Sequence, residues 1–303
     1  MITFIQVQIR IAKHAQEPKN GGEKPYPPLP NSQAACRKIR KTSAASMESC
    51  YDFCEEDILQ WCQDPHRRII GGSTGGTQVI RVGHQFAVKF GDVFPEEADN
   101  QRKAYDLLDK KVVRVPRVYC FFARKGVGYL LMEYIEGSRD DGIDDSDRAD
   151  IVAKVVDYLG TLQGTHPGPF AGGASRGLLW PEAEDITFDT VDYLESYLNS
   201  RLIDCQDKLN LVETSLVACH LDVAPRNILW LEDGSICLLD WASAGYYPRF
   251  FEFCALRVNT GDNGRDLRFT QQLMKAMKPL TKMEVHQQDL VLRARFNNIR
   301  YHL

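Results

Sequence analysis

Residues 218–247 read ACHLDVAPRNILWLEDGSICLLDWASAGYY, and this stretch decides the fold of the chain. Two apolar runs, 228–231 and 236–239, flank Asp233 and Gly234, a dipeptide that is typical of a two-residue hairpin turn. Residues equally far from such a turn face each other, which places Asn227 opposite Asp240 at the open end of the hairpin. Opposed side chains lie about 4.5–5.5 Å apart at Cβ, so we expect an amide and a carboxylate to meet there.

Two further polar residues precede the first apolar run of this hairpin. Asp222 lies five residues before Asn227, and His220 lies two residues before Asp222. Carboxylate and amide oxygens suit Mg²⁺, and a carboxylate beside them can accept a proton. We therefore expect Asn227 and Asp240 to hold magnesium, Asp222 to orient and deprotonate a hydroxyl group, and His220 to brace the loop. A base next to a magnesium site is typical of phosphoryl transfer.

The composition excludes several classes of protein. The chain has 303 residues, of which 44% are hydrophobic, enough for a substantial core. The net charge of −4 argues against a nucleic-acid binder, and no apolar run approaches the roughly 20 residues of a membrane helix. No signal peptide is recognisable, and the nine cysteines are scattered without a CxxC pair. We expect a cytoplasmic protein with reduced thiols, whose oligomeric state the sequence does not indicate.

Residues 1–46 differ in composition from the rest of the chain. A segment rich in proline and glycine, 16–30, is followed by a basic cluster at 37–41, and we expect a disordered extension. The basic cluster is compatible with a nuclear signal and the acid-free beginning with a transit peptide, although a solvated tail is the simpler interpretation. Met47 opens the globular part, and we keep the hypothesis that translation starts there rather than at Met1.

The order of the expected elements indicates an α+β fold with two lobes. A small antiparallel sheet with one helix fills residues 47–136, and a larger, mainly helical lobe fills residues 137–303. The patterns predict strands at 67–70, 77–82, 85–90, 117–123 and 128–135. They predict helices at 55–63, 95–109, 148–162 and 190–202.

Three groups in the first lobe are candidates for binding a nucleotide. Lys89 ends a strand, and Glu97 points inward from the following helix, so we expect them to form an ion pair because a buried carboxylate needs a cation. Glu96 and Asn100 share the wetter face of that helix. The glycine-rich loop 71–76 lies between two strands rather than before a helix, so it is no Walker loop. Its backbone and the hydroxyl groups of two residues are expected to contact phosphates, namely Ser73 and Thr74.

The connection between the lobes can bind a base, and acidic residues elsewhere can bind the acceptor. The C=O of Glu133 and the N–H of Ile135 are expected to face an adenine edge, although a simple linker would use the same residues. An acidic run at 140–147 suggests a polycationic acceptor, but solvated caps before a helix are the favoured interpretation. Further possible contacts with the acceptor are Asp185, Asp189 and Glu252.

Residues 55–303 resemble the aminoglycoside phosphotransferase and choline kinase-like superfamily, its fungal-type members especially. The resemblance is carried by the HxDxxxxN segment at 220–227 and by Leu239-Asp240-Trp241. Further matches in family order lie at 244–248, 86–89, 97–98, 132–137 and 191–194. It implies a protein-kinase-like fold, ATP and Mg²⁺ as cofactors, and transfer of the γ-phosphoryl group to a hydroxyl of an unidentified small molecule.

Two departures from the family pattern leave alternatives open. Leu221 replaces a small or polar residue and can either crowd the acceptor or pack inward, and the tail after Pro248 is compact. A protein kinase is one alternative, although Trp-Ala follows Asp240 where Phe-Gly is expected and no APE segment follows. A nucleotide-binding pseudokinase or interaction module is the other, although such a protein has no need of the complete residue set.

Overall fold

The computed structural model describes residues 53–72, 76–139, 145–181, 185–203, 205–259 and 264–302. The expected disordered extension, the hypothesis on Met47, and the proposed phosphate contacts Ser73 and Thr74 lie outside the described residues. So do three of the acidic residues of the run at 140–147. Asp147, in the same run, is exposed in the first turn of helix α4 (Asp145–Leu159), as the interpretation of solvated caps predicts.

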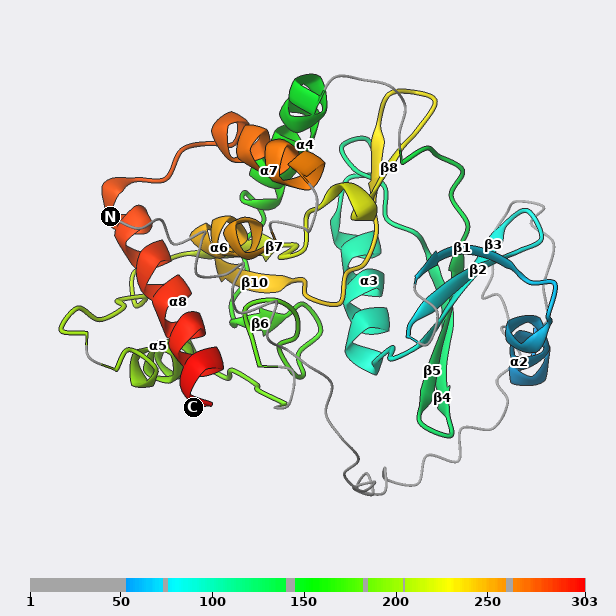
Figure 1. Cartoon of the computed structure of the whole chain (residues 1–303), viewed down its shortest axis with the longest axis horizontal. Helices are drawn as coiled ribbons and strands as arrows, with labels where there is room; N and C mark the ends of the chain where they lie inside the picture. Colours follow the sequence, from blue (N-terminus) through cyan, green and yellow to red (C-terminus); the bar gives the residue numbers. More distant parts are fainter. Residues whose placement is uncertain are drawn as a thin grey trace.

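The first part of the described chain is a five-stranded antiparallel sheet (Figure 1). Its strands run in the order β1-β2-β3-β5-β4. Helix α2 (Glu55–Gln63) packs on the outer face, and helix α3 (Pro95–Leu107) stands between the sheet and the helical part of the molecule. The strands are β1 (Arg68–Gly72), β2 (Gln78–Val82), β3 (Phe86–Gly91), β4 (Val118–Arg124) and β5 (Val127–Glu133). The α+β architecture expected from the sequence is confirmed, and the boundary expected at residues 136/137 stays a prediction.

Helix α3 buries more polar side chains than its pattern predicts. Pro95 opens the helix and Glu97 points inward, as expected. Asn100, which we expected on the wetter face, is fully buried, so this expectation was wrong. Its Nδ2 donates to the carbonyl oxygens of Trp241 and Ala244, at 3.2 and 2.8 Å, so the donor end of the buried amide is paired.

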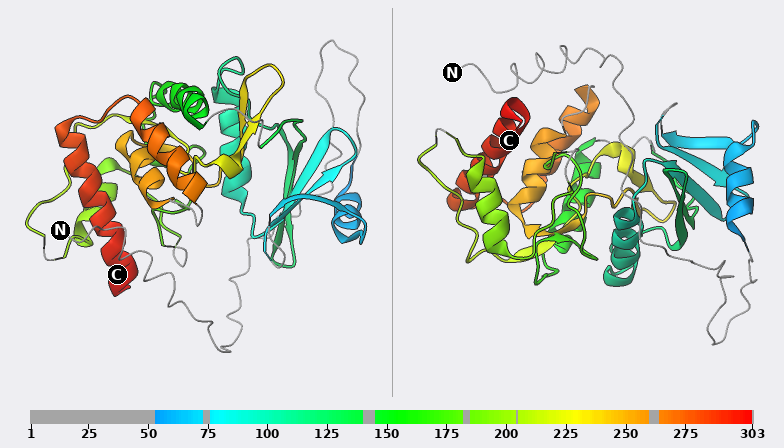
Figure 2. Two further views of the ribbon diagram at one scale, coloured as in Figure 1. Left: turned by 45° about the horizontal axis from the view of Figure 1, so that its top comes forward. Right: turned by 90° about the horizontal axis from the view of Figure 1, so that it is seen from below.

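The second part of the chain combines helices with two small sheets (Figure 2). One sheet has the order β6-β10-β7, and its strands were not predicted. Helices α4 and α7 pack together, and α8 packs on α5 and α6. The remaining elements are β6 (Gly168–Pro169), α5 (Val191–Ser200), β7 (Leu216–Cys219), η1 (Pro225–Asn227), β8 (Ile228–Trp230), β9 (Ile236–Leu238), β10 (Gly245–Pro248), α6 (Phe250–Val258), α7 (Gly264–Ala276) and α8 (Lys282–Tyr301).

The predicted hairpin exists as β8 and β9, but its register differs by one residue. Ile228 pairs with Leu238, and the N–H of Leu239 donates to the C=O of Asn227 at 2.9 Å. Asn227 therefore faces Leu239 rather than Asp240, and the predicted opposition was wrong. The reason is a three-residue loop at 232–234, closed by a hydrogen bond of 3.0 Å from the N–H of Leu231 to the C=O of Ser235.

The side chain of Asp233 and the backbone of Gly234 favour the longer turn. Asp233 accepts hydrogen bonds from the N–H and the hydroxyl of Ser235, at 3.0 and 2.6 Å. Such local bonds to the backbone compete with a tighter turn. Gly234 has a φ of 79°, the left-handed conformation that a three-residue hairpin loop requires at this position.

Because Gly234 has a left-handed backbone conformation, Gly234→Ala is expected to lower the free energy of unfolding by about 1 kcal/mol. Chemical denaturation measures this change. Gly160→Ala is the matched control, since Gly160 follows helix α4 without a positive φ. Equal stability of the two variants would contradict the three-residue turn.

Candidate active site

One lysine joins three separate parts of the chain. The Nζ atom of Lys89, in β3, lies 2.6 Å from Oε1 of Glu97, in α3, and the predicted ion pair is thereby confirmed. The same Nζ lies 3.1 Å from Oδ1 of Asp240, the residue that follows the β8–β9 hairpin. The side chains of Lys89 and Glu97 are only 13% and 5% exposed, whereas Asp240 reaches solvent; we call these three residues the lysine cluster.

Burial and charge act against each other in the lysine cluster. Burial lowers the pKa of Lys89, but the carboxylates of Glu97 and Asp240 outweigh burial and raise it, which keeps the ammonium charged. Burial raises the pKa of Glu97 although Lys89 lowers it. Removal of Lys89 or Glu97 would leave a charge uncompensated in a largely dry environment, which is strongly destabilising.

The segment 218–223 is fixed by two hydrophobic clusters. Ala218 and Val223 pack into one cluster together with Trp241, and Cys219 and Leu221 pack into the other. Leu221 is 1% exposed, so this bulky residue packs inward rather than toward the acceptor. Its φ of 61° is unusual for a residue other than glycine. The loop before Asp222 is therefore held in a strained conformation by its surroundings.

Glu252 bonds the backbone of this strained loop. It lies in the first turn of α6, is fully buried, and accepts the N–H of His220 at 2.7 Å. Its two oxygens also accept the N–H of Leu221 at 3.2 and 3.1 Å. Burial raises the pKa of Glu252 to about 7. The expected contact of Glu252 with the acceptor is wrong, because the buried carboxylate is turned toward the loop backbone.

His220 braces the loop, as the sequence analysis expected. Its Nε2 lies 3.1 Å from the C=O of Leu239, and its Nδ1 accepts the N–H of Asp222 at 3.3 Å. The ring packs edge-on against Trp241. Burial lowers the pKa of His220 to about 4. The neutral ring, with its proton on Nε2, therefore ties the segment before Asp222 to the residue before Asp240.

Asp222 is surrounded by donors. Its Oδ2 accepts the Nδ2 of Asn227 at 2.8 Å, and its Oδ1 accepts the Nδ2 of Asn259 at 2.8 Å. Arg226 also donates to Oδ1. Burial raises the pKa of Asp222 to about 6, against the lowering effect of Arg226, and the charge of Asp240 raises it further. A carboxylate with this pKa is ionised at neutral pH and is a stronger base than an exposed aspartate.

Asn227 and Asp240 offer oxygens near Asp222 despite the shifted register. Asn227 uses its Nδ2 for Asp222, which leaves its Oδ1 for another partner. Asp240 has a φ of 63°, so the chain turns sharply as it leaves the hairpin. The described residues contain no cluster of three or more His, Cys, Asp or Glu side chains that could hold a metal ion by themselves. A Mg²⁺ at this site would therefore need phosphate oxygens, which is usual for this ion.

The connection after β5 is held by contacts with neighbouring segments. The N–H of Tyr134 donates to the C=O of Gln85, and the side chain of Glu133 pairs with Arg114 at 2.8 Å. The contact of the Glu133 C=O and the Ile135 N–H with an adenine edge stays a prediction.

Sequence reasoning missed three polar residues that support the site, namely Asn100, Arg226 and Asn259. Asn100 fixes α3 to the segment that follows Asp240, and the other two contact Asp222. Arg226 lies between His220 and Asn227 in the HxDxxxxN segment, and this position could have indicated a contact with Asp222. No pattern in the sequence connects Asn100 or Asn259 with residues more than 30 positions away.

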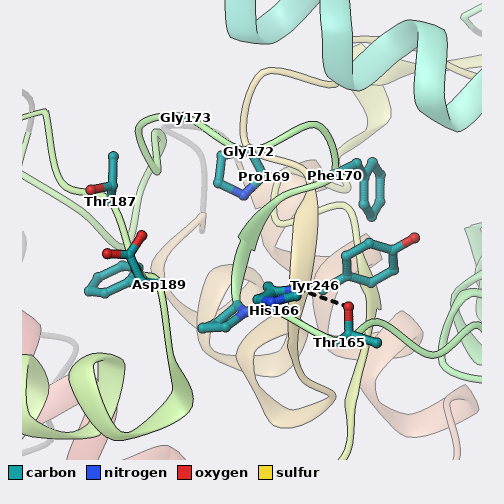
Figure 3. Close-up of a pocket in the computed structure, with 11 residues that line it drawn as sticks. Thr165, His166, Pro169, Phe170, Gly172, Gly173, Thr187, Asp189 and Tyr246 are labelled. Atoms are coloured by element: carbon teal, nitrogen blue, oxygen red, sulfur yellow. Dashed lines mark hydrogen bonds between the residues drawn. The ribbon is translucent and has the colours of Figure 1, made fainter.

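A cavity of about 500 Å³ is lined by a different set of residues (Figure 3). Of the site residues considered above, only Asp189 lines it. Asp189, one of the expected acceptor contacts, faces the segment that carries His166 and Pro169. Asp185, another, is exposed and pairs with Arg176 at 2.7 Å. Neither aspartate contacts Asp222 or Asp240.

The fold is similar to that of solved kinases of small molecules. Aminoglycoside phosphotransferase APH(4)-Ia, a thermostable mutant in its apo form, is 14% identical, with a TM-score of 0.50 over 81% of this chain and 89% of that chain. A putative fructosamine-3-kinase from Haemophilus somnus is 14% identical, with a TM-score of 0.46 over 81% and 88%. Aminoglycoside-3'-phosphotransferase of type VIII is 17% identical, with a TM-score of 0.47 over 79% and 98%.

A sequence profile defines the class more closely than these structures. The profile of the phosphotransferase enzyme family matches residues 72–282. The chain belongs to this family, whose enzymes transfer phosphate to hydroxyl groups of small molecules. A comparison with curated proteins finds no match. The match begins in β1 and ends in α8, so it includes the lysine cluster, the loop around Asp222 and the hairpin.

Glu252→Ala tests the support of the strained loop. Because two buried N–H groups lose their acceptor, we expect the free energy of unfolding to fall by about 3 kcal/mol and phosphotransferase activity to be lost. Denaturant unfolding and a phosphate-release assay measure the two effects. The control is Glu195→Ala, since Glu195 accepts the N–H of Leu211 at 2.6 Å elsewhere in the helical part. Full turnover in a folded Glu252→Ala protein would show that the loop does not need this carboxylate.

Proposed function

We propose that this protein is an ATP- and Mg²⁺-dependent kinase that transfers the γ-phosphoryl group to a hydroxyl of a small molecule. The observation that carries the proposal is the arrangement of Asp222 beside Asn227, together with Lys89 bonded to both Glu97 and Asp240. A candidate base, oxygens for a cation and a fixed ammonium group thereby lie in one place. Phosphoryl transfer needs little more than such positioning and neutralisation of charge.

The lysine cluster provides the contacts for the phosphates in this proposal. Glu97 holds the ammonium of Lys89 from the side of α3, so the lysine keeps a fixed position when a phosphate approaches it. Asn100 ties the same helix to the residues after Asp240. The loop at 71–76 and the connection at Glu133 and Ile135 complete the nucleotide site in the proposal.

The oxygen donors at the site fit magnesium. Asp240 supplies a carboxylate and Asn227 an amide oxygen, a set that hard cations prefer. Bound there, Mg²⁺ would neutralise charge on the phosphates of the nucleotide. The side chain of Asp240 is 37% exposed, more than that of Lys89, so a cation can reach its carboxylate from solvent.

Asp222 acts as the base in the transfer. It accepts the proton of the acceptor hydroxyl while the acceptor oxygen forms a bond to the γ-phosphorus. The bond between that phosphorus and the oxygen bridging to the β-phosphate breaks, and ADP leaves with the electron pair. The proton later passes from Asp222 to solvent. Burial favours this role, since it raises the pKa of Asp222 to about 6.

We further propose that the enzyme works in the cytoplasm on a soluble metabolite or an aminoglycoside-like acceptor. Seven cysteines in the described part of the chain are free thiols, as a reducing compartment favours. Within the same part, no helix is both long and apolar enough to cross a membrane.

Two substitutions separate catalysis from nucleotide binding. Asp222→Asn should lower phosphate release from MgATP by about 10²–10⁴-fold, the usual contribution of a general base, with nearly normal ATP binding. Asp240→Ala should weaken MgATP binding by about tenfold or more, because the carboxylate for the cation is lost. Thermal shift measures binding, and slow ATP hydrolysis without an acceptor measures turnover.

The exposed Asp150, in α4, provides the control, and Asp150→Asn should match the wild type in both assays. Equal turnover in wild type and Asp222→Asn would leave only nucleotide binding and would favour a pseudokinase. Faster labelling of serine- or arginine-rich proteins than of any metabolite pool would favour a protein kinase.

A further inference from the structure

Asp222, Arg226 and Asn259 form a closed ring of hydrogen bonds. The Nδ2 of Asn259 donates to Oδ1 of Asp222 at 2.8 Å, and the Nη1 of Arg226 donates to Oδ1 of Asn259 at 3.1 Å. The ring closes through the Nη2 of Arg226, which donates to the same Oδ1 of Asp222. Both ends of the Asn259 amide are used, so its orientation in the ring is fixed by the network.

The ring makes the two oxygens of Asp222 unequal. Oδ1 accepts from both Asn259 and Arg226, and a carboxylate oxygen has two acceptor positions. Oδ2 accepts only from Nδ2 of Asn227 among the hydrogen bonds of the described residues. One acceptor position therefore remains on Oδ2, beside the residue that we propose as a magnesium ligand.

Asn259 is attached to the loop around Asp222 through helix α6. At its first turn Glu252 binds the N–H groups of His220 and Leu221. At its end Asn259 is the C-cap residue, whose N–H donates to the C=O of Ala255 at 2.8 Å. The helix is buried from Phe250 to Leu256, and Asn259 at its end is half-buried. The same helix thus holds the loop backbone at one end and the Asp222 carboxylate at the other. The side chain of Arg226, in contrast, is 48% exposed.

We propose that Asn259 is a positioning residue, which holds Oδ1 of Asp222 so that Oδ2 faces the hydroxyl of the acceptor. The inference rests on the proposed function, in which Asp222 is the base. The acceptor proton passes to Oδ2, while Oδ1 keeps its two donors throughout the reaction. Asn259 itself touches neither the acceptor nor the nucleotide, so it acts only through Asp222.

Asn259→Ala is therefore expected to lower kcat for Mg²⁺-dependent phosphate release by about tenfold, the loss that one hydrogen bond to a charged group provides. KM for MgATP should stay within about twofold, because the lysine cluster is untouched. In an Asp222→Asn background the same substitution should cause no further fall in kcat. A residue with a merely structural role would lower kcat in both backgrounds.

Asn259→Asp serves if the alanine variant does not fold. It has nearly the same shape and keeps an acceptor for Arg226, but it places an oxygen against Oδ1 of Asp222, so kcat should fall at least as far. The matched control is Asn297→Ala, since the Asn297 amide donates to the C=O of Arg201 at 2.8 Å in another part of the helical lobe. Its kcat per folded molecule should equal that of the wild type.

The outcomes separate this inference from the proposed function. Full kcat in Asn259→Ala or Asn259→Asp, with an active wild type, would overturn the inference alone. An equal further fall of kcat in the Asp222→Asn background would also overturn it, because Asn259 would then act by another route. A wild type without Mg²⁺-dependent turnover would overturn the proposed function, and with it the inference.

Discussion

The site depends on one nearly buried ammonium group. Lys89 is the common partner of Glu97 and Asp240, so the central sheet strand, helix α3 and the end of the β8–β9 hairpin meet at a single atom. A charge in such a place is tolerated only when carboxylates compensate its loss of hydration. The position of α3 relative to the hairpin is therefore linked to the ionisation of these groups. Asn100 adds a neutral connection between the same two elements.

A second constraint acts on the backbone around the proposed base. Leu221 and Asp240 both have positive φ angles, which cost free energy in residues other than glycine. Glu252, His220 and the packing of the Leu221 side chain hold these conformations. Such strain is expected where side chains must converge from separate segments, and here the segments before β8 and after β9 bring Asp222 and Asp240 together. Helix α6 is the common support, through both of its ends.

Local patterns predicted much of this arrangement. The five-stranded sheet follows from alternating and apolar runs, and the Lys89–Glu97 pair follows from helical periodicity together with the cost of burying a carboxylate. The spacing of His220, Asp222 and Asn227 placed these residues in one loop, where the structure has them. In each case the residues that determine the feature lie within one element or in two neighbouring elements.

The features that the sequence did not predict depend on tertiary contacts or on a single side-chain bond. The register of the hairpin shifted by one residue because Asp233 bonds Ser235 and favours a longer loop. Asn100 is buried because two distant carbonyl groups accept its amide, which helical periodicity does not reveal. Glu252, expected as a possible contact of the acceptor, instead accepts backbone N–H groups of a loop that lies 31 or 32 positions away. The strands β6 and β10 are too short for a recognisable alternation.

Transfer of label from γ-labelled ATP to a metabolite extract tests the central claim most directly. The reaction is run with the purified protein in the presence of Mg²⁺ and again with a chelator, and small-molecule and protein fractions are counted separately. The account predicts a labelled small molecule that forms only with Mg²⁺ and is not formed by the Asp222→Asn protein. Label that appears equally with Asp222→Asn, or in no small molecule from any extract, would contradict it.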